Sequence, residues 1–211
     1  MPEKYQNRYR IKSARLEGYD YSQPGMYFIT ICTDKRKHYF GDIVDGKMQL
    51  SEIGVLADEL WYSIKSHHKN IELHEFVVMP NHIHGILEIV DGGNGGDDDD
   101  NGGRDDARIV STETENTVDN DKSNCINDAR IVSKQMKKIS PKSGSLGRII
   151  GSYKSVVSKQ AHRLGYEFEW QSRFYDHIIH NKIDYNRISK YVINNPQNWK
   201  DDKFNGKNND D

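Results

Sequence analysis

Two histidines two positions apart are the residues best suited to chemistry in this chain. His82 and His84 lie in an apolar run, residues 82 to 90, that is typical of a strand. Because side chains alternate along a strand, both imidazoles share one face, where together they can bind a metal ion. A polar strand face without a ligand is the alternative. The opposite face carries Ile83, Leu87 and Ile89, which we expect in a core.

One carboxylate shares the histidine face of this strand. Glu88 is four residues from His84, which corresponds to about 13 Å along a strand. At that distance we expect Glu88 to lie outside the metal site. The sequence therefore indicates no competing carboxylate ligand.

A tyrosine and an asparagine on a later helix are the next candidates. The helix is expected to start near Lys182 and to end at Asn195, because the following Pro196 disfavours helical backbone in the residue before it. Tyr191 and Asn195 are four residues apart and so share one helix face. The rest of that face is apolar, so spacing alone leaves both a core role and a catalytic role open for the tyrosine.

The remaining periodic segments predict the elements that position these residues. We expect a strand over 26–33, a hairpin turning at 45–46, a helix capped by Ser51 that ends before Asn70, a strand over 71–79, a helix over 146–164 and a last strand before His180. The order strand, helix, strand, strand, helix, strand is ferredoxin-like. The predicted fold class is α+β, with an antiparallel sheet, helices on one face, and the hairpin and C-terminal helix as additions.

Charge is distributed unevenly along the 211 residues. Residues 91 to 133 contain twelve acids and four bases, so the rest of the chain carries about +6 although the whole chain carries −2. Residues 91–143 are rich in Gly, Asn, Asp and Ser, and we predict a disordered insertion there. It would interrupt a single domain over 21–199, which follows a basic, aromatic arm over 1–20 and precedes a disordered tail over 200–211.

Basic residues on the arm and on the second helix are candidates for binding DNA. Bases interleaved with tyrosines can bind phosphates and stack on nucleobases, whereas an unstructured terminus and an ordinary charged helix face are the alternatives. The candidate DNA-binding residues are Arg8, Arg10, Lys12, Arg15, Arg148, Lys154, Lys159, Arg163 and Arg173.

Cysteine usage and hydropathy indicate the compartment. The two cysteines, Cys32 and Cys125, form no CxxC motif, which favours a reducing environment. No apolar run approaches the ~18 residues that span a bilayer, and the N-terminus lacks a signal-peptide core. We therefore expect a cytoplasmic protein without a membrane partner.

Three segments taken together resemble the REP-associated tyrosine transposases, which are HUH single-strand DNA nucleases with one catalytic tyrosine. They are Val-Met-Pro-Asn-His-Ile-His-Gly at 78–85, Trp-Gln-Ser-Arg-Phe-Tyr-Asp-His at 170–177 and Tyr-Val-Ile-Asn-Asn-Pro at 191–196, and the opening 15–21 is similar as well. The resemblance covers residues 8–90 and 144–199. It is specific because the motifs occur jointly and in order.

The resemblance implies roles for the candidate residues. Tyr191 would be the nucleophile, and His82, His84 and Asn195 would bind Mg²⁺ or Mn²⁺, of which imidazole ligation favours Mn²⁺. The substrate would be single-stranded DNA with hairpins, the REP elements, cut through a 5′-phosphotyrosine. The protein would work as a monomer or a homodimer.

Two further classes of function compete with the enzyme. A domesticated, catalytically silent protein could bind the same DNA hairpins, although the intact His82, His84 and Tyr191 favour the enzyme. A generic RNA-binding ferredoxin-like domain is disfavoured because the RRM aromatic signature is absent.

Overall fold

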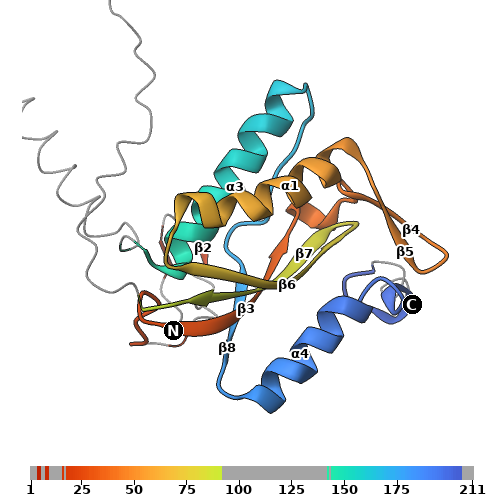
Figure 1. The fold of residues 1–211 in the computed structure, drawn as a ribbon. Coiled ribbons are helices and arrows are strands. Elements are labelled where there is room, and N and C mark those ends of the chain that lie inside the picture. Colours follow the sequence, from red (N-terminus) through yellow and green to blue (C-terminus); the bar gives the residue numbers. More distant parts are fainter. Residues whose placement is uncertain are drawn as a thin grey trace, which may run out of the picture. The chain divides into compact units, whose positions relative to one another are not determined.

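A four-stranded antiparallel sheet forms the centre of the fold (Figure 1). A computed structural model describes residues 4–5, 8–9, 16, 18–91, 142 and 144–205. The sheet order is β6-β7-β3-β8, from the strands β3 (Gly25–Cys32), β6 (Ile71–Met79), β7 (His82–Ile89) and β8 (Tyr175–Ile179). In this order the first and third strands of the sheet lie at its centre, as in ferredoxin-like folds, so the predicted fold class is confirmed.

Helices lie on both faces of this sheet (Figure 1). α1 (Glu52–His67) and α3 (Leu146–Arg163) cover one face, and α4 (Lys182–Asn194) covers the other. The two ferredoxin-type helices therefore share one face, as expected. The added C-terminal helix covers the opposite face, which also carries the histidines.

Shorter elements complete the described part of the chain. The predicted hairpin is present as β4 (Gly41–Val44) and β5 (Lys47–Leu50), and it turns at Asp45 and Gly46, which both have positive φ. The others are β1 (Lys4–Tyr5), β2 (Arg8–Tyr9) and the 3₁₀ turns η1 (Asp34–Arg36) and η2 (Trp199–Asp201).

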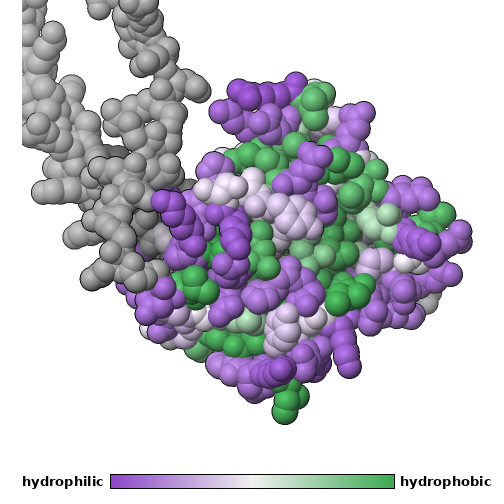
Figure 2. All heavy atoms as spheres, in the orientation of Figure 1, coloured by the Kyte–Doolittle hydropathy of each residue, from purple (hydrophilic) through white to green (hydrophobic). Residues whose placement is uncertain are grey.

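Strand alternation divides the apolar residues between two layers. Ile83 and Leu87 of β7 pack with α1 and α3 in the larger core, whereas Ile86 packs with Ile188 and Val192 of α4. In the view of Figure 2, hydrophilic residues dominate the outline of the described part and hydrophobic residues show between them. His82 and His84 are separated from Ile86 by an even number of positions, so their side chains lie on the same face of β7 as Ile86. They therefore face α4.

Side-chain caps begin two of the helices where the sequence predicts. The Ser51 hydroxyl accepts a hydrogen bond from the amide of Gly54 at 3.1 Å, and the Asn181 side chain accepts one from the amide of Asp184 at 2.9 Å. Each cap satisfies an amide that lacks an intrahelical partner. These caps define the starts of α1 and α4.

The end of the described chain differs from the prediction. We expected a disordered tail from residue 200, but residues 200–205 pack against the domain, with Asp202, Phe204 and Asn205 buried. The aromatic rings of Trp199 and Phe204 supply the apolar surface that anchors this segment. The prediction is wrong for 200–205, while residues 206–211 and nearly all of the predicted insertion lie outside the described residues.

A helix that crosses a bilayer must be both long and apolar. Within the described ranges, none of the helices meets both requirements.

Candidate metal and nucleophile site

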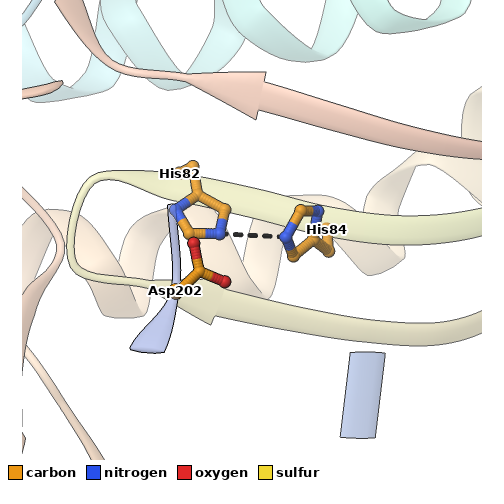
Figure 3. Close-up of side chains that lie close together, drawn as sticks. All are labelled: His82, His84 and Asp202. Carbon is orange, nitrogen blue, oxygen red and sulfur yellow. Dashed lines mark hydrogen bonds between the residues drawn. The ribbon is translucent and has the colours of Figure 1, made fainter. Parts of the chain in front are cut away.

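Both histidines of β7 face α4 with their Nε2 atoms close together. The Nε2 atoms of His82 and His84 are 3.0 Å apart, as drawn in Figure 3, and the side chains are 0% and 1% exposed. Burial lowers the pKa of His84 to about 3 and the pKa of His82 well below its ordinary value. Both rings are therefore neutral at physiological pH, the form in which imidazole binds metals.

The second ring nitrogen of each histidine, Nδ1, also has a hydrogen-bond partner. Nδ1 of His82 is 2.9 Å from Oδ1 of Asn81, and Nδ1 of His84 is 2.9 Å from the Thr30 hydroxyl. Metal-binding histidines commonly use their second nitrogen in this way, which fixes the orientation of the ring. The two imidazoles are thus held so that their Nε2 atoms point to the same place.

A carboxylate completes this group. One ligand atom each from His82, His84 and Asp202 lie within 4.8 Å of one another (Figure 3). Asp202 is absent from the residues predicted from the sequence, because residues 200–211 were assigned to a disordered tail and no carboxylate ligand was expected. The sequence feature that could have indicated an ordered segment here is the pair of aromatic residues, Trp199 and Phe204, on either side of Asp202.

The predicted nucleophile lies beside the same group. The Tyr191 hydroxyl is 3.2 Å from Nε2 of His84 and 3.5 Å from Oδ2 of Asp202, and the side chain is 41% exposed. Partial burial and the Asp202 charge raise the pKa of Tyr191 to about 12. The structure therefore brings together His82, His84 and Tyr191, which the sequence singled out.

Asn195, predicted as a metal ligand, contacts the carboxylate. Its Nδ2 donates to Oδ2 of Asp202 at 3.2 Å, and its buried Oδ1 has no hydrogen-bond partner among the described residues. An unpartnered buried oxygen is costly, and binding an ion would satisfy it. Two imidazole nitrogens, a carboxylate and this amide oxygen are donors that fit a divalent ion such as Mn²⁺. That Asn195 itself binds the ion stays a prediction.

Aromatic residues of the C-terminal segment cover the histidines. The ring centroids of Phe204 and Trp199 lie 4.5 and 5.9 Å from that of His82. The Arg36 guanidinium and the Lys203 ammonium each lie 5.0 Å from the centre of the Phe204 ring. Residues 199–205, which we call the covering segment, therefore close the site and bring positive charge to it.

A cavity of about 780 Å³ lies next to the covering segment. Its lining includes Trp199, Lys200 and Asn205 of that segment, together with His38 and the hairpin residue Asp42. Trp199 also contacts the ring of His82. The cavity and the metal site are thus neighbours that share one aromatic side chain.

The predicted DNA-binding residues of α3 lie away from this site. Arg148, Lys159 and Arg163 are exposed on the helix that covers the opposite face of the sheet. Lys154 instead donates to the carbonyl oxygens of Gln171 and Arg173 at 2.7 and 3.1 Å, so it ties α3 to the following loop.

The arm residues are less completely described. Arg8 belongs to β2. Arg10, Lys12 and Arg15 lie outside the described residues. DNA binding by any of the nine candidate bases stays a prediction.

The described residues define a class of protein, a ferredoxin-like α+β domain with a histidine–carboxylate site beside a helix tyrosine. No family model matches the chain. A Haemophilus influenzae protein described as uncharacterized is 31% identical over 194 residues, which cover 92% of each chain. The chain belongs to the same family as this Haemophilus protein.

Two solved structures are also similar to the chain. One is described as a REP-associated tyrosine transposase bound to a REP hairpin, with 18% identity, coverage of 88% of this chain and 73% of that chain, and a TM-score of 0.45. The other is a Deinococcus radiodurans protein named as a candidate transposase, with 13% identity, coverage of 85% and 97%, and a TM-score of 0.38.

Proposed function

We propose that this protein is a metal-dependent single-strand DNA endonuclease and strand transferase, an HUH enzyme of the REP-associated tyrosine transposase type that acts on hairpin-forming repeats. One observation carries the proposal, namely the Tyr191 hydroxyl 3.2 Å from Nε2 of His84, which in turn lies 3.0 Å from Nε2 of His82. A nucleophile beside a pair of metal-type ligands is the arrangement that this chemistry needs. The joint motifs in the sequence support the same reading.

In this proposal His82, His84 and Asp202 hold the metal. Bound there, Mg²⁺ or Mn²⁺ supplies Lewis-acid polarisation of the scissile phosphate. Arg36 and Lys203 add positive potential, since both lower the pKa of His82 through space. That potential favours the approach of a phosphodiester.

Tyr191 provides the attacking oxygen. The bond from its oxygen to phosphorus forms while the bond from phosphorus to the 3′ oxygen breaks, and the tyrosine loses the proton that the 3′ hydroxyl gains. The product is a 5′-phosphotyrosine, which conserves the phosphodiester energy and allows rejoining without ATP. Burial and the Asp202 charge both raise the pKa of Tyr191, so neutralisation of that charge by a bound cation would favour deprotonation of the attacking tyrosine.

The side chains of Trp199 and Phe204 must move aside before DNA can react, while Asp202 stays beside the histidines. Both imidazoles are at most 1% exposed and lie under the rings of Trp199 and Phe204, so a phosphate cannot reach them in this arrangement. The neighbouring cavity offers space for a nucleotide adjacent to the scissile phosphate.

The burial of both histidines under Trp199 and Phe204 also favours a second candidate function. This is a catalytically silent protein that binds DNA hairpins without cutting them. The two functions are separated by incubating labelled single-stranded hairpin oligonucleotides with the protein and Mn²⁺ and running denaturing and native gels. The enzyme gives a covalent band that EDTA prevents. A native shift without any covalent band would favour the silent protein.

Loss of a metal ligand is expected to weaken metal binding strongly. His82→Ala and Asp202→Ala should each lower Mn²⁺ affinity by more than about tenfold in calorimetry, because each removes one donor of the group formed by His82, His84 and Asp202. His177→Ala is the matched control, since this histidine on β8 pairs with Asp184 at 2.8 Å outside the group. Equal Mn²⁺ affinity in the wild type and all three variants would contradict the assignment of His82 and Asp202 as metal ligands.

A further inference from the structure

We propose that Asn81 is a positioning residue that fixes the tautomer and ring orientation of His82, so that His82 presents a lone pair at Nε2. Asn81 belongs to the two-residue turn between β6 and β7 and is 1% exposed. The inference takes from the proposed function only that His82 binds a metal. It concerns a residue with no part in the reaction itself.

The orientation of the Asn81 amide follows from its donors. Nδ2 donates to the carbonyl oxygens of Phe204 at 2.9 Å and Arg36 at 3.2 Å. Carbonyl oxygens only accept hydrogen bonds, so the nitrogen of the amide must lie on that side. Oδ1 therefore faces Nδ1 of His82, 2.9 Å away, and can only accept a proton from it.

The tautomer of His82 follows in turn. Because Oδ1 of Asn81 accepts, Nδ1 of His82 carries the ring proton, and Nε2 of the neutral ring keeps its lone pair. This Nε2 is the atom 3.0 Å from His84, within the group that includes Asp202. Asn81 thus holds His82 in the form that binds a metal before any metal arrives.

His84 is held differently, which makes the role of Asn81 specific. Its Nδ1 lies 2.9 Å from the Thr30 hydroxyl, and a hydroxyl can either donate or accept. Without a metal, His84 can donate from Nε2 to the lone pair of His82, which accounts for the 3.0 Å contact. With a metal, the proton can reside on Nδ1 and Thr30 can accept it.

Two variants separate the acceptor of Asn81 from its donors. Asn81→Asp keeps an oxygen that accepts from His82 but loses the donors to Phe204 and Arg36, whereas Asn81→Ala loses both. Since loss of a partner of a metal-binding histidine typically costs about 10–100-fold in affinity, we expect Asn81→Ala to weaken Mn²⁺ binding by that factor. Asn81→Asp should bind Mn²⁺ at least as tightly as the wild type, although both variants lose the two donors.

A control variant perturbs the same turn without touching His82. The buried Thr33 hydroxyl lies 2.9 and 2.8 Å from the carbonyl oxygens of Asn81 and Lys37, which share its single proton. Thr33→Val should lower the melting temperature and leave Mn²⁺ affinity within about twofold, because the acceptor at His82 remains.

Nitrogen-15 NMR of the metal-free protein reads the tautomer directly, with the His82 signals assigned by their loss in His82→Ala. The wild type should show a protonated Nδ1 and an unprotonated Nε2, and Asn81→Asp should keep this pattern. An unprotonated Nδ1 in the wild type would overturn the proposal even if Asn81→Ala failed to fold. So would Asn81→Ala that folds and binds Mn²⁺ like the wild type. Neither readout needs DNA, so absence of cleavage would contradict the proposed function and leave this inference standing.

Discussion

Replacing Tyr191 by phenylalanine is expected to remove the covalent protein–DNA adduct and DNA cleavage, by more than about a thousandfold, while hairpin affinity changes little. The substitution removes only the attacking oxygen. The ring keeps its edge contact with Phe28, and the hydroxyl is 3.2 Å or more from its two neighbours, so the fold loses little. Denaturing gels measure the adduct, and a gel shift measures hairpin binding.

Tyr185→Phe is the matched control on the same helix. Its hydroxyl donates to the Glu75 carboxylate at 2.9 and 3.0 Å and takes no part in the histidine group. We expect this variant to form the adduct normally. Adduct formation by Tyr191→Phe would show that another tyrosine is the nucleophile, and Tyr153, Tyr175 and Tyr185 would then be replaced in turn.

A large loss of stability is expected from Gly85→Ala. A Cβ at Gly85 would lie 2.5 and 2.6 Å from two atoms of the Trp61 ring, which is fully buried and stacked on Phe76 with centroids 4.5 Å apart. Overpacking of this kind costs about 1–3 kcal/mol or more, which lowers the melting temperature by about 2–4 °C per kcal/mol in a domain of this size. Thermal denaturation followed by circular dichroism measures the shift.

Gly151→Ala provides a control with the opposite sign. Gly151 lies inside α3 and is exposed, and a Cβ added there would meet no neighbouring side chain within 4 Å among the described residues. Alanine there should stabilise the protein by about 0.5–1 kcal/mol, because glycine is a poor helix former. Equal melting temperatures for the two variants would contradict the close packing of β7 against Trp61.

Most of the positions of the helices and strands could be predicted because their apolar residues are periodic. Strand alternation on β7 placed both histidines on one face, and the spacing on α4 placed Tyr191 and Asn195 on another. Proline at 196 marked the end of α4 to within a residue. The sequence does not show by itself that these two faces meet, because that contact depends on where α4 packs.

Asp202 could not be predicted by the same means. It lies in a short segment without a period, between an isolated tryptophan and an isolated phenylalanine, so neither helix nor strand patterning marks it. Its position depends on Trp199 and Phe204 packing over the histidines. By contrast, the position of the α3 bases on the far side of the sheet could be predicted from the alternation of side chains along β7. Ile83 and Leu87 point to α3, whereas the histidines point away from it.

The most direct test of the proposed function is to digest the wild-type adduct with trypsin and locate the nucleotide by mass spectrometry. Tyr191 is the single tyrosine in the peptide 191–200, whereas Tyr175 and Tyr185 fall in the separate peptides 174–182 and 183–187. We expect the 5′-phosphate and its nucleotides on the peptide 191–200, or on 188–200 where the adduct blocks cleavage after Lys190. An adduct on either of the other peptides, or a hairpin cut by the protein without any tyrosine adduct, would contradict this expectation.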